Sequence, residues 1–478
     1  MTLRTLACSA VLILCWRAAV LHCDHWPQFR GPDGTGISES SPLPVEFGPS
    51  KNLVWRVPVP PGHSSPVIWG DRIFFTAFEG KNLLTLCLDR ASGKTLWKQE
   101  APRDRFEPYQ STNTPTSPTP VTDGRQVYVF FGDFGLIAYT IGGAEIWRLP
   151  MGPFNNVNGH GSSPILADGK VILICDQDTD SYLIAVDQKT GKPVWKTPRP
   201  EVTRGYATPA VYRPAGAPAE LIVPGAYQVA GYSLETGRKL WWVRGMAWQL
   251  KSVPLIEDDI LYVSGWEIGG DTEKPPEIPS FEEILEQHDR NRDGRLGLDE
   301  LASEHRIYPD EDLNHDGQVS GREWEFRRAR RTAQNNIAAI RTGGKGDVTD
   351  THVLWRYRKS LPNVPSPLLY RNVIFLVKDG GITTTLNPET GTVLKQGRLP
   401  GATEHYWSSP VAGDNKVYLV SEAGKVSVLK ATGNWEVLAL NDLREDCYAT
   451  PAIVDGKIYL RTRSHLYCFG LLESADEK

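Results

Sequence analysis

Two short acidic stretches carry oxygen-bearing side chains at the spacing that a hard divalent cation requires. One runs from Asp289 to Glu300 and the other from Asp312 to Glu323, and each is twelve residues long. Positions one, three and five supply side-chain oxygen, position seven a backbone carbonyl, and position twelve a bidentate carboxylate. The expected ligands are Asp289, Asn291, Asp293, Arg295 and Glu300 in the first stretch, and Asp312, Asn314, Asp316, Gln318 and Glu323 in the second. Because Ca²⁺ prefers a flexible cage of oxygen atoms, the pattern predicts two calcium sites.

The spacing is that of the EF-hand loop, in which glycine at position six allows the sharp turn. Gly294 and Gly317 stand there, and Leu296 and Val319, two residues later, are expected to pair the loops through a short strand contact. A final helix is expected over residues 324–340. The loops start only 23 residues apart, which favours a structural calcium clip over a sensor that opens widely. The alternative is a pair of acidic turns that bind no metal.

A second group of candidate residues precedes a series of short apolar segments. They are polar or aromatic: His63, His160, Tyr206, Trp248, His405 and Trp407, with Asn113 and Tyr448 beside them. If those segments are the innermost strands of a closed ring, the side chains converge around a central channel and form a site for a protein or small-molecule ligand. The other interpretation is that they cap strands and pack between repeats. The three histidines are suited to metal binding or proton transfer, although their repeats are far apart.

The elements that must position these groups recur along the chain. A Ser/Thr-Pro or Val-Pro step introduces each apolar segment, at Pro66, Pro118, Pro164, Pro209, Pro254, Pro367, Pro410 and Pro451. The successive spacings are 52, 46, 45, 45, 113, 43 and 41 residues. Each unit reads as strand, polar turn and strand, then a strand, a Thr-Gly or Ser-Gly turn and a last strand with a bulky residue such as Trp195. Four strands at this period predict an all-β fold, an eight-bladed β-propeller, with a small α-helical EF-hand insert in the long interval.

The domain boundaries follow from the repeat. We expect a signal peptide over residues 1–23, the propeller over residues 24–266 and 351–470, the insert over residues 267–350, and a C-terminal tail over residues 471–478. The last unit lacks its outer strand, and residues 52–57 have the composition of that strand. We therefore expect the N-terminal segment to complete the eighth blade, which would remove the exposed edges of an open array.

The repeat motif resembles that of a known family. Residues 185–195 read Ala-Val-Asp-Gln-Lys-Thr-Gly-Lys-Pro-Val-Trp, which is similar to the pyrroloquinoline-quinone enzyme repeat. The Trp-Pro-Gln-Phe-Arg-Gly-Pro run at residues 26–32 and the Gly-His-Ser-Ser-Pro step at residues 62–66 resemble a planctomycete-type subgroup of secreted quinone-repeat-like propellers. The resemblance implies the propeller fold. The same repeat occurs in cofactor-free propellers of outer-membrane barrel-assembly lipoproteins, so it does not by itself imply an activity.

Two function classes follow from the resemblance. The first is an exported calcium-binding propeller that acts as a binding or scaffold module. The second is a pyrroloquinoline-quinone-dependent oxidoreductase of alcohols or sugars, with the quinone as a cofactor beside Ca²⁺. Enzymes of that kind need a stacking Trp, a channel Ca²⁺ and a catalytic Asp, and often carry adjacent cysteines. The chain has no Cys-Cys pair, no CxxCH haem motif and no matching Asp motif, so we expect the first class and assign no catalytic residue.

The first residues indicate export. Arg4 precedes an apolar run over residues 6–16, which is too short to span a bilayer. This predicts a signal peptide and a periplasmic or extracellular protein, with a buried N-terminal helix as the alternative. Cys23 stands where a lipoprotein cysteine would stand, so membrane contact is expected only if it is lipidated.

Charge and cysteine usage restrict the partners. Loss of residues 1–23 removes Arg4 and Arg17 and no acid, so the formal charge changes from −5 to −7. An acidic protein of this kind is not expected to bind nucleic acid non-specifically. Cys447 and Cys468 fall in one repeat and form either a disulfide or a pair of buried free thiols.

Overall fold

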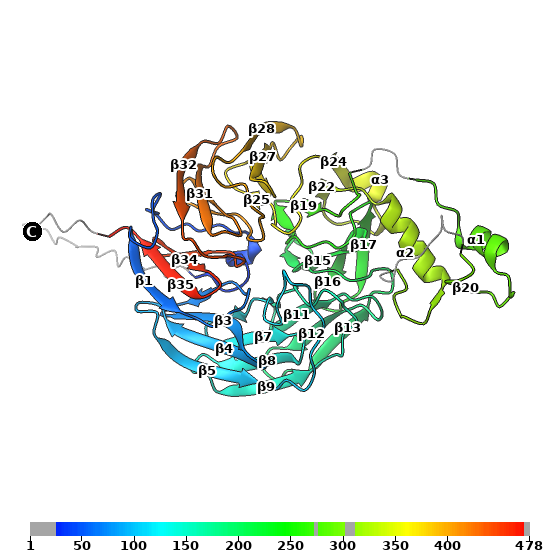
Figure 1. The fold of residues 1–478 in the computed structure, drawn as a ribbon, viewed down its shortest axis with the longest axis horizontal. Helices are drawn as coiled ribbons and strands as arrows, with labels where there is room; N and C mark the ends of the chain where they lie inside the picture. Colours follow the sequence, from blue (N-terminus) through cyan, green and yellow to red (C-terminus); the bar gives the residue numbers. More distant parts are fainter. Residues whose placement is uncertain (1–24, 272–275, 302–310, 473–478) are drawn as a thin grey trace, which may run out of the picture.

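The computed structural model describes residues 25–271, 276–301 and 311–472. Eight antiparallel sheets, each built on four hydrogen-bonded strands, form a ring around a central axis (Figure 1). A smaller part with helices α1 and α2 projects from one side (Figure 1). The eight-bladed β-propeller is therefore confirmed. The expected signal peptide, Cys23 and residues 473–478 lie outside the described residues, within which no helix is long and apolar enough to cross a membrane.

Each blade runs from an innermost strand beside the axis to an outermost strand. Blades one to four contain β2 (Val67–Trp69), β3 (Arg72–Glu79), β4 (Asn82–Asp89) and β5 (Thr95–Ala101); β6 (Val121–Thr122), β7 (Gln126–Phe131), β8 (Gly135–Thr140) and β9 (Glu145–Pro150); β10 (Ile165–Ala167), β11 (Lys170–Cys175), β12 (Tyr182–Asp187) and β13 (Pro193–Pro198); and β14 (Ala210–Tyr212), β15 (Glu220–Gly225), β16 (Gln228–Ser233) and β17 (Lys239–Arg244).

Blades five to eight contain β18 (Leu255–Glu257), β19 (Ile260–Gly265), β22 (Asn336–Arg341) and β24 (Val353–Tyr357); β25 (Leu368–Leu369), β26 (Ile374–Lys378), β27 (Ile382–Leu386) and β28 (Val393–Arg398); β29 (Val411–Gly413), β30 (Lys416–Val420), β31 (Lys425–Lys430) and β32 (Val437–Asp442); and β33 (Ala452–Val454), β34 (Lys457–Arg461), β35 (His465–Gly470) and β1 (Leu53–Pro58). The other elements are η1 (Pro32–Gly34), α1 (Phe281–His288), β20 (Leu296–Gly297), β21 (Gln318–Val319), α2 (Gly321–Thr332), β23 (Gly346–Asp347) and α3 (Thr349–His352).

The repeat motif is explained by contacts within a blade. Trp195 on β13 stands opposite Ala185 on β12, beside a β-bulge, and the small alanine leaves room for the indole on the shared face. Asp187 ends β12, and its carboxylate accepts hydrogen bonds from the backbone N–H and the hydroxyl of Thr190, both at 2.8 Å. An Asp that binds the backbone in this way fixes the turn into the next strand.

Tryptophans on the outer strands connect neighbouring blades. Trp147 on β9 donates from Nε1 to the carbonyl of Gln188 in the next blade at 3.0 Å and packs on Gly191. Gly191 has a φ of +69°, and a Cβ built there would lie 2.5 Å from Trp147 Cδ2, so only glycine fits. The same contact with the next blade's turn is made by Trp55, Trp97, Trp195 and Trp355.

The ring closes between blades eight and one. β1 pairs antiparallel with β35, which confirms the closing strand predicted at residues 52–57. Arg461, at the end of β34, adds a second link, because its Nη1 donates to the carbonyls of Ser64 at 3.0 Å and Thr76 at 2.8 Å in blade one. Closure leaves β35 hydrogen-bonded on both sides, to β34 and to β1, which removes its exposed edge.

Blade five differs from the expectation in one strand. α2 ends at Thr332, and residues 336–341 form β22 between β19 and β24. The helix predicted to continue to Ile340 is therefore wrong over its last part, and the blade's third strand falls within the range 267–350 assigned to the insert. The physical reason is burial on both faces: residues 337–340 are four consecutive apolar residues with no exposed surface, which a strand packed between two blades provides.

The cysteines of the described ranges are buried free thiols. Cys447 and Cys468 are not bridged, so the free-thiol alternative holds. Burial raises the pKa of each to about 12, which keeps both protonated and unreactive at neutral pH.

Candidate functional site

A cavity of about 500 Å³ lies where the innermost strands begin. Two layers of residues, one per blade in each layer, surround it. The lower layer is the residue before each strand-initiating proline: Ser65, Thr119, Ser163, Thr208, Val253, Ser366, Ser409 and Thr450. The upper layer is the residue two positions earlier: His63, Ser117, Gly161, Tyr206, Lys251, Val364, Trp407 and Tyr448. Every upper-layer residue lines the cavity.

The lower layer is a ring of hydrogen bonds. In seven of the eight blades the backbone N–H of the lower-layer residue donates to the hydroxyl of the next blade's residue at 3.0 Å, as from Thr119 to Ser163. The ring is interrupted at Val253, which has no hydroxyl. It also corrects the repeat register, because the proline that introduces blade two is Pro120, directly before β6, and not Pro118.

One side of the upper layer is a wall of stacked rings, formed by His63, Tyr448 and Trp407 (the aromatic wall). The ring centroids of His63 and Tyr448 are 4.1 Å apart with planes inclined by 7°, and those of Trp407 and Tyr448 are 6.3 Å apart and inclined by 18°. The Tyr448 hydroxyl donates to Glu422 at 2.8 Å. Burial, with Arg461 and Arg463 nearby, lowers the pKa of His63 to about 3, so this ring is neutral at physiological pH.

The opposite side of the cavity is polar and carries the cationic side chain of Lys251. Lys251 Nζ donates to Asn363 Oδ1 at 3.0 Å. Desolvation lowers the pKa of Lys251 to about 8, and Glu267 offsets part of this effect. Glu267 also lines the cavity, and its Oε1 lies 4.0 Å from Arg330 on α2. The cavity therefore combines a wall of stacked aromatic rings with one ammonium group and one carboxylate.

The N-terminal segment closes the channel below the two layers. Residues 26–38 cross the ring (dark blue near the centre of Figure 1): Trp26 N donates to Ile68 O in blade one at 2.9 Å, and Ser38 N donates to Ala412 O in blade seven at 2.8 Å. Both carbonyls lie three residues beyond the lower layer. Phe29, from the same segment, lines the cavity, so the cavity is blind and opens at one end.

The layers account for which predicted residues reach the cavity. His63, Tyr206 and Trp407 are upper-layer residues and line it, as do Asn113 and Tyr448. In the two layers alternate residues face the channel, as successive side chains of an extended chain point in opposite directions; farther from the strands the alternation ends, since Asn158 and Asn363 also line the cavity.

The other predicted residues lie elsewhere. His160 and Trp248 stand three and five positions before the lower layer, at odd offsets. His160 packs against Phe154 with ring centroids 4.3 Å apart, and burial lowers its pKa to about 4. Trp248 donates to Thr203 Oγ1 at 2.8 Å and lies under α2.

His405 is exposed at the rim. Its Nδ1 lies 3.0 Å from Asp379, and this carboxylate raises the pKa of His405. The three histidines therefore do not meet.

Sequence reasoning missed Lys251, Glu267 and Phe29. Lys251 had a signal, because it stands two positions before Val253 just as His63 stands two before Ser65. Glu267 and Phe29 had none, since neither follows the repeat, and only the packing of other segments brings them to the channel.

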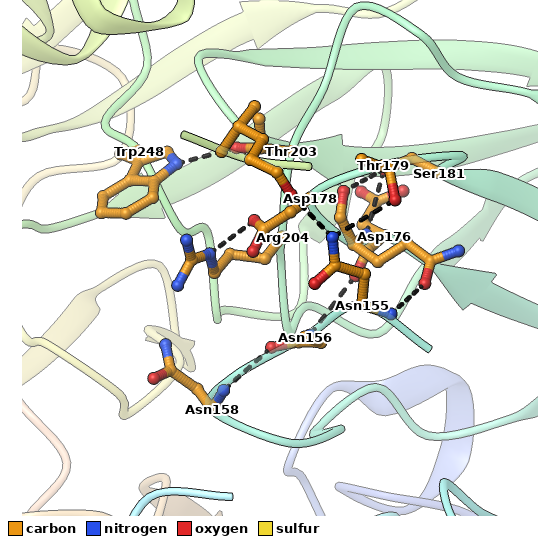
Figure 2. A network of polar contacts seen from close by, with 12 residues as sticks. Asn155, Asn156, Asn158, Asp176, Asp178, Thr179, Ser181, Thr203, Arg204 and Trp248 are labelled. Atoms are coloured by element: carbon orange, nitrogen blue, oxygen red, sulfur yellow. Dashed lines mark hydrogen bonds and ion pairs between the residues drawn. The ribbon is translucent and has the colours of Figure 1, made fainter. Parts of the chain in front are cut away.

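Figure 2 shows a polar network between the cavity and the projecting part. Asn158 lines the cavity, and its Nδ2 donates to the hydroxyl of Tyr206 at 2.7 Å. The buried ion pair of Arg204 and Asp178, at 2.6 Å, occupies the middle. On the far side Asn155 Nδ2 donates to the carbonyl of Leu313 at 2.7 Å, inside the second acidic stretch. The second loop is thus anchored to the propeller.

The two acidic stretches pair with each other. Leu296 stands opposite Val319 in the β20–β21 contact, which confirms the predicted pairing. In each loop the first Asp accepts a 3.0 Å hydrogen bond from the N–H of the position-six glycine, from Gly294 to Asp289 and from Gly317 to Asp312.

The glutamates at position twelve accept hydrogen bonds from backbone N–H groups of their own loops. Glu300 accepts from Arg290 at 3.0 Å, and Glu323 accepts from Leu313 at 2.8 Å. The other predicted ligands lie on the same loops: Asn291, Asp293, Arg295, Asn314, Asp316 and Gln318. Among the described residues, no group of three or more His, Cys, Asp or Glu side chains is gathered closely enough to hold a metal ion.

Comparison with known proteins gives one family. The model described as outer membrane protein assembly factor BamB matches residues 48–203, 84–265 and 316–476. These matches overlap and leave out residues 266–315, where the first acidic stretch lies. No curated protein matches the chain.

Solved structures with the same architecture include BamB and dehydrogenases. BamB from Moraxella catarrhalis has a TM-score of 0.56 at 12% identity, covering 89% of this chain and 99% of that one. A europium-containing methanol dehydrogenase has a TM-score of 0.61 at 9% identity, with 94% and 98% covered. The quinohemoprotein alcohol dehydrogenase ADHIIG from Pseudomonas putida HK5 has a TM-score of 0.56 at 12% identity, with 95% and 81% covered. At such identities the likeness shows the fold alone.

Proposed function

The chain belongs to the family of pyrroloquinoline-quinone-like repeat propellers described as outer membrane protein assembly factor BamB, and from this premise we propose that it is an exported binding propeller that holds a small ligand in its blind cavity. The supporting observation is the contrast between the two layers. The lower layer is Ser or Thr in every blade but one, because the hydrogen-bonded ring needs a hydroxyl there. The upper layer faces the void and carries seven different residue types in eight blades.

Symmetric packing alone would favour similar side chains at equivalent positions of similar blades. Large half-buried rings such as Trp407 and Tyr206, placed beside Lys251 over an unfilled volume, instead form an asymmetric surface with an apolar face and a few polar groups. Such a surface is typical of small-molecule sites.

The lining does not fit a channel Ca²⁺ with its quinone. Calcium needs several oxygen ligands, preferably carboxylates. Among the described lining residues Glu267 is the one carboxylate, and it lies beside Arg330. We therefore derive no redox step and favour ligand binding over the oxidoreductase alternative.

The acidic loops support a second part of the proposal, an EF-hand pair that binds structural calcium. Gly294 and Gly317 have φ values of +77° and +78°, as the sharp turn requires. Asp289, Asn291, Asp293, Glu300 and the carbonyl of Arg295 would hold one ion, and Asp312, Asn314, Asp316, Glu323 and the carbonyl of Gln318 the other. The bound ions would neutralise the clustered carboxylates. This insert, with export and the planctomycete-type motifs, would make the protein a calcium-stabilised secreted propeller.

Tryptophan fluorescence tests the binding function, because Trp266 and Trp407 line the cavity. The purified chain is titrated with a panel of sugars and carboxylic acids, and separately with pyrroloquinoline quinone plus Ca²⁺. We expect a saturable change with a member of the first panel that Val364→Trp abolishes by filling the upper layer. Circular dichroism checks that this variant folds.

Two results would contradict the proposal. A ligand response that Val364→Trp leaves unchanged would place binding outside the cavity. A stoichiometric quinone spectrum with reduction of an acceptor dye would favour the oxidoreductase alternative.

A further inference from the structure

The first observation is a buried cation whose charge is only partly balanced inside the cavity. Lys251 lies in the upper layer, and its Nζ contacts the neutral amide oxygen of Asn363 at 3.0 Å. The carboxylate of Glu267 belongs to the same lining and acts on Lys251, but it also lies 4.0 Å from Arg330 on α2. A cation removed from water is costly unless an anion accompanies it. The cavity is therefore prepared for a ligand that brings an anionic group to Lys251.

The second observation is an excess of hydrogen-bond donors. The hydroxyl oxygens of the lower layer, such as those of Ser163 and Ser409, each accept a backbone N–H, so the hydroxyl hydrogen remains for a ligand above the ring. The indole nitrogens of Trp266 and Trp407 are buried, and no hydrogen-bond partner for them occurs among the described residues. A matching ligand carries many acceptor oxygens, because buried donors without acceptors are unfavourable.

The third observation is the shape of the aromatic wall. His63 and Tyr448 stack face to face, with ring centroids 4.1 Å apart and planes inclined by 7°, and Trp407 continues the series beside Tyr448. All three line the cavity, so the carbon edges of these rings form an apolar strip that can bury the apolar face of a ligand ring. Anion, oxygen acceptors and an apolar ring face occur together in a sugar that carries a carboxylate.

We infer that the cavity binds the carboxylate-bearing sugar ring of a uronic acid, with its carboxylate at Lys251, its hydroxyls toward the lower layer, and its ring face on the aromatic wall. The inference rests on the proposed binding function and names its ligand class. An aromatic carboxylic acid would satisfy Lys251 and the wall but would leave the donors of the lower layer without partners. A neutral sugar would satisfy the donors and leave the charge of Lys251 only partly balanced.

Calorimetric titration of the full-length mature chain at pH 7 tests this with galacturonate, glucuronate, glucose, benzoate and inorganic phosphate as separate probes. We expect a uronate to bind at least about tenfold more tightly than glucose or benzoate. Lys251→Met should reduce uronate affinity by about tenfold or more, Lys251→Arg should retain most of it, and Lys430→Met, at an exposed lysine on β31, should have no effect. Uronate affinity should also fall as pH rises above about 8, where the ammonium loses its proton.

The outcomes separate the inference from the proposed function. Equal binding of glucose and uronate, or uronate binding that survives Lys251→Met, overturns the role of Lys251. If neither uronate binds while another compound binds in a Val364→Trp-sensitive manner, the ligand class is wrong and the binding cavity stands. If phosphate binds as well as the uronates, the site recognises charge and not a sugar acid.

Discussion

Gly191 and Gly169 form a matched pair in blade three that tests how the blades are joined. Both have left-handed backbone, with φ of +69° and +72°. A Cβ at Gly191 would lie 2.5 Å from the ring of Trp147, whereas a Cβ at Gly169 meets nothing described within 4 Å. Gly169→Ala should therefore cost about 1–2 kcal/mol, the penalty for a left-handed L-residue. Gly191→Ala should add about 1–3 kcal/mol for overpacking against the indole.

The assay is equilibrium urea unfolding followed by far-UV circular dichroism, with the midpoint and slope compared among variants. A double-mutant cycle with Trp147→Leu isolates the contact, because leucine removes the indole that meets Gly191. We expect the extra cost of Gly191→Ala to disappear when Trp147 is Leu, with a coupling of about 1–3 kcal/mol. Equal costs for Gly169→Ala and Gly191→Ala would refute the Trp–Gly contact as a constraint between blades.

Three further predictions concern calcium, pH and ring closure. Calorimetry should detect two calcium sites, and each of Glu300→Gln and Glu323→Gln should remove one of them. Only Glu323→Gln should make the insert more sensitive to limited proteolysis. No binding at millimolar Ca²⁺ would disprove the sites. Because the pKa of His160 falls from 6.5 to about 4 on folding, the unfolded chain binds more protons in that window. Stability should therefore drop by about 3 kcal/mol as pH falls from 6.5 to 4, and an unchanged pH profile in His160→Phe would contradict this. Arg461→Met leaves the carbonyls of blade one that Arg461 binds without a donor and should destabilise the chain by about 2–5 kcal/mol. Arg461→Lys should lose less stability. A Met variant as stable as the parent in urea would rule out Arg461 as a closing contact.

The fold was accessible from the sequence because its signals are local and repeated. The Asp187 turn, the left-handed Gly191 and the Trp147 that covers it each lie within one period of the chain. Closure by residues 52–57 followed from a missing strand and a matching one, and the Leu296–Val319 pairing followed from loop spacing.

Errors arose where local signals compete with long-range packing. Pro118 and Pro120 stand two residues apart, and only the hydrogen bond from Thr119 to Ser163 identifies the proline that begins blade two. Residues 337–340 suit a helix by their continuation of α2, yet burial between two blades makes them β22.

The sequence by itself determined the number of blades, their strand order and the residues that repeat, because hydrogen-bonded turns and apolar periodicity act over a few residues. Only the tertiary structure decided which side chains share the cavity. Lys251 and His63 come from blades on opposite sides of the ring, Phe29 arrives with a segment that crosses the channel, and Glu267 is brought in where α2 packs on the propeller. Their proximity depends on ring closure and on the alternating direction of side chains in space, which no local stretch of sequence specifies.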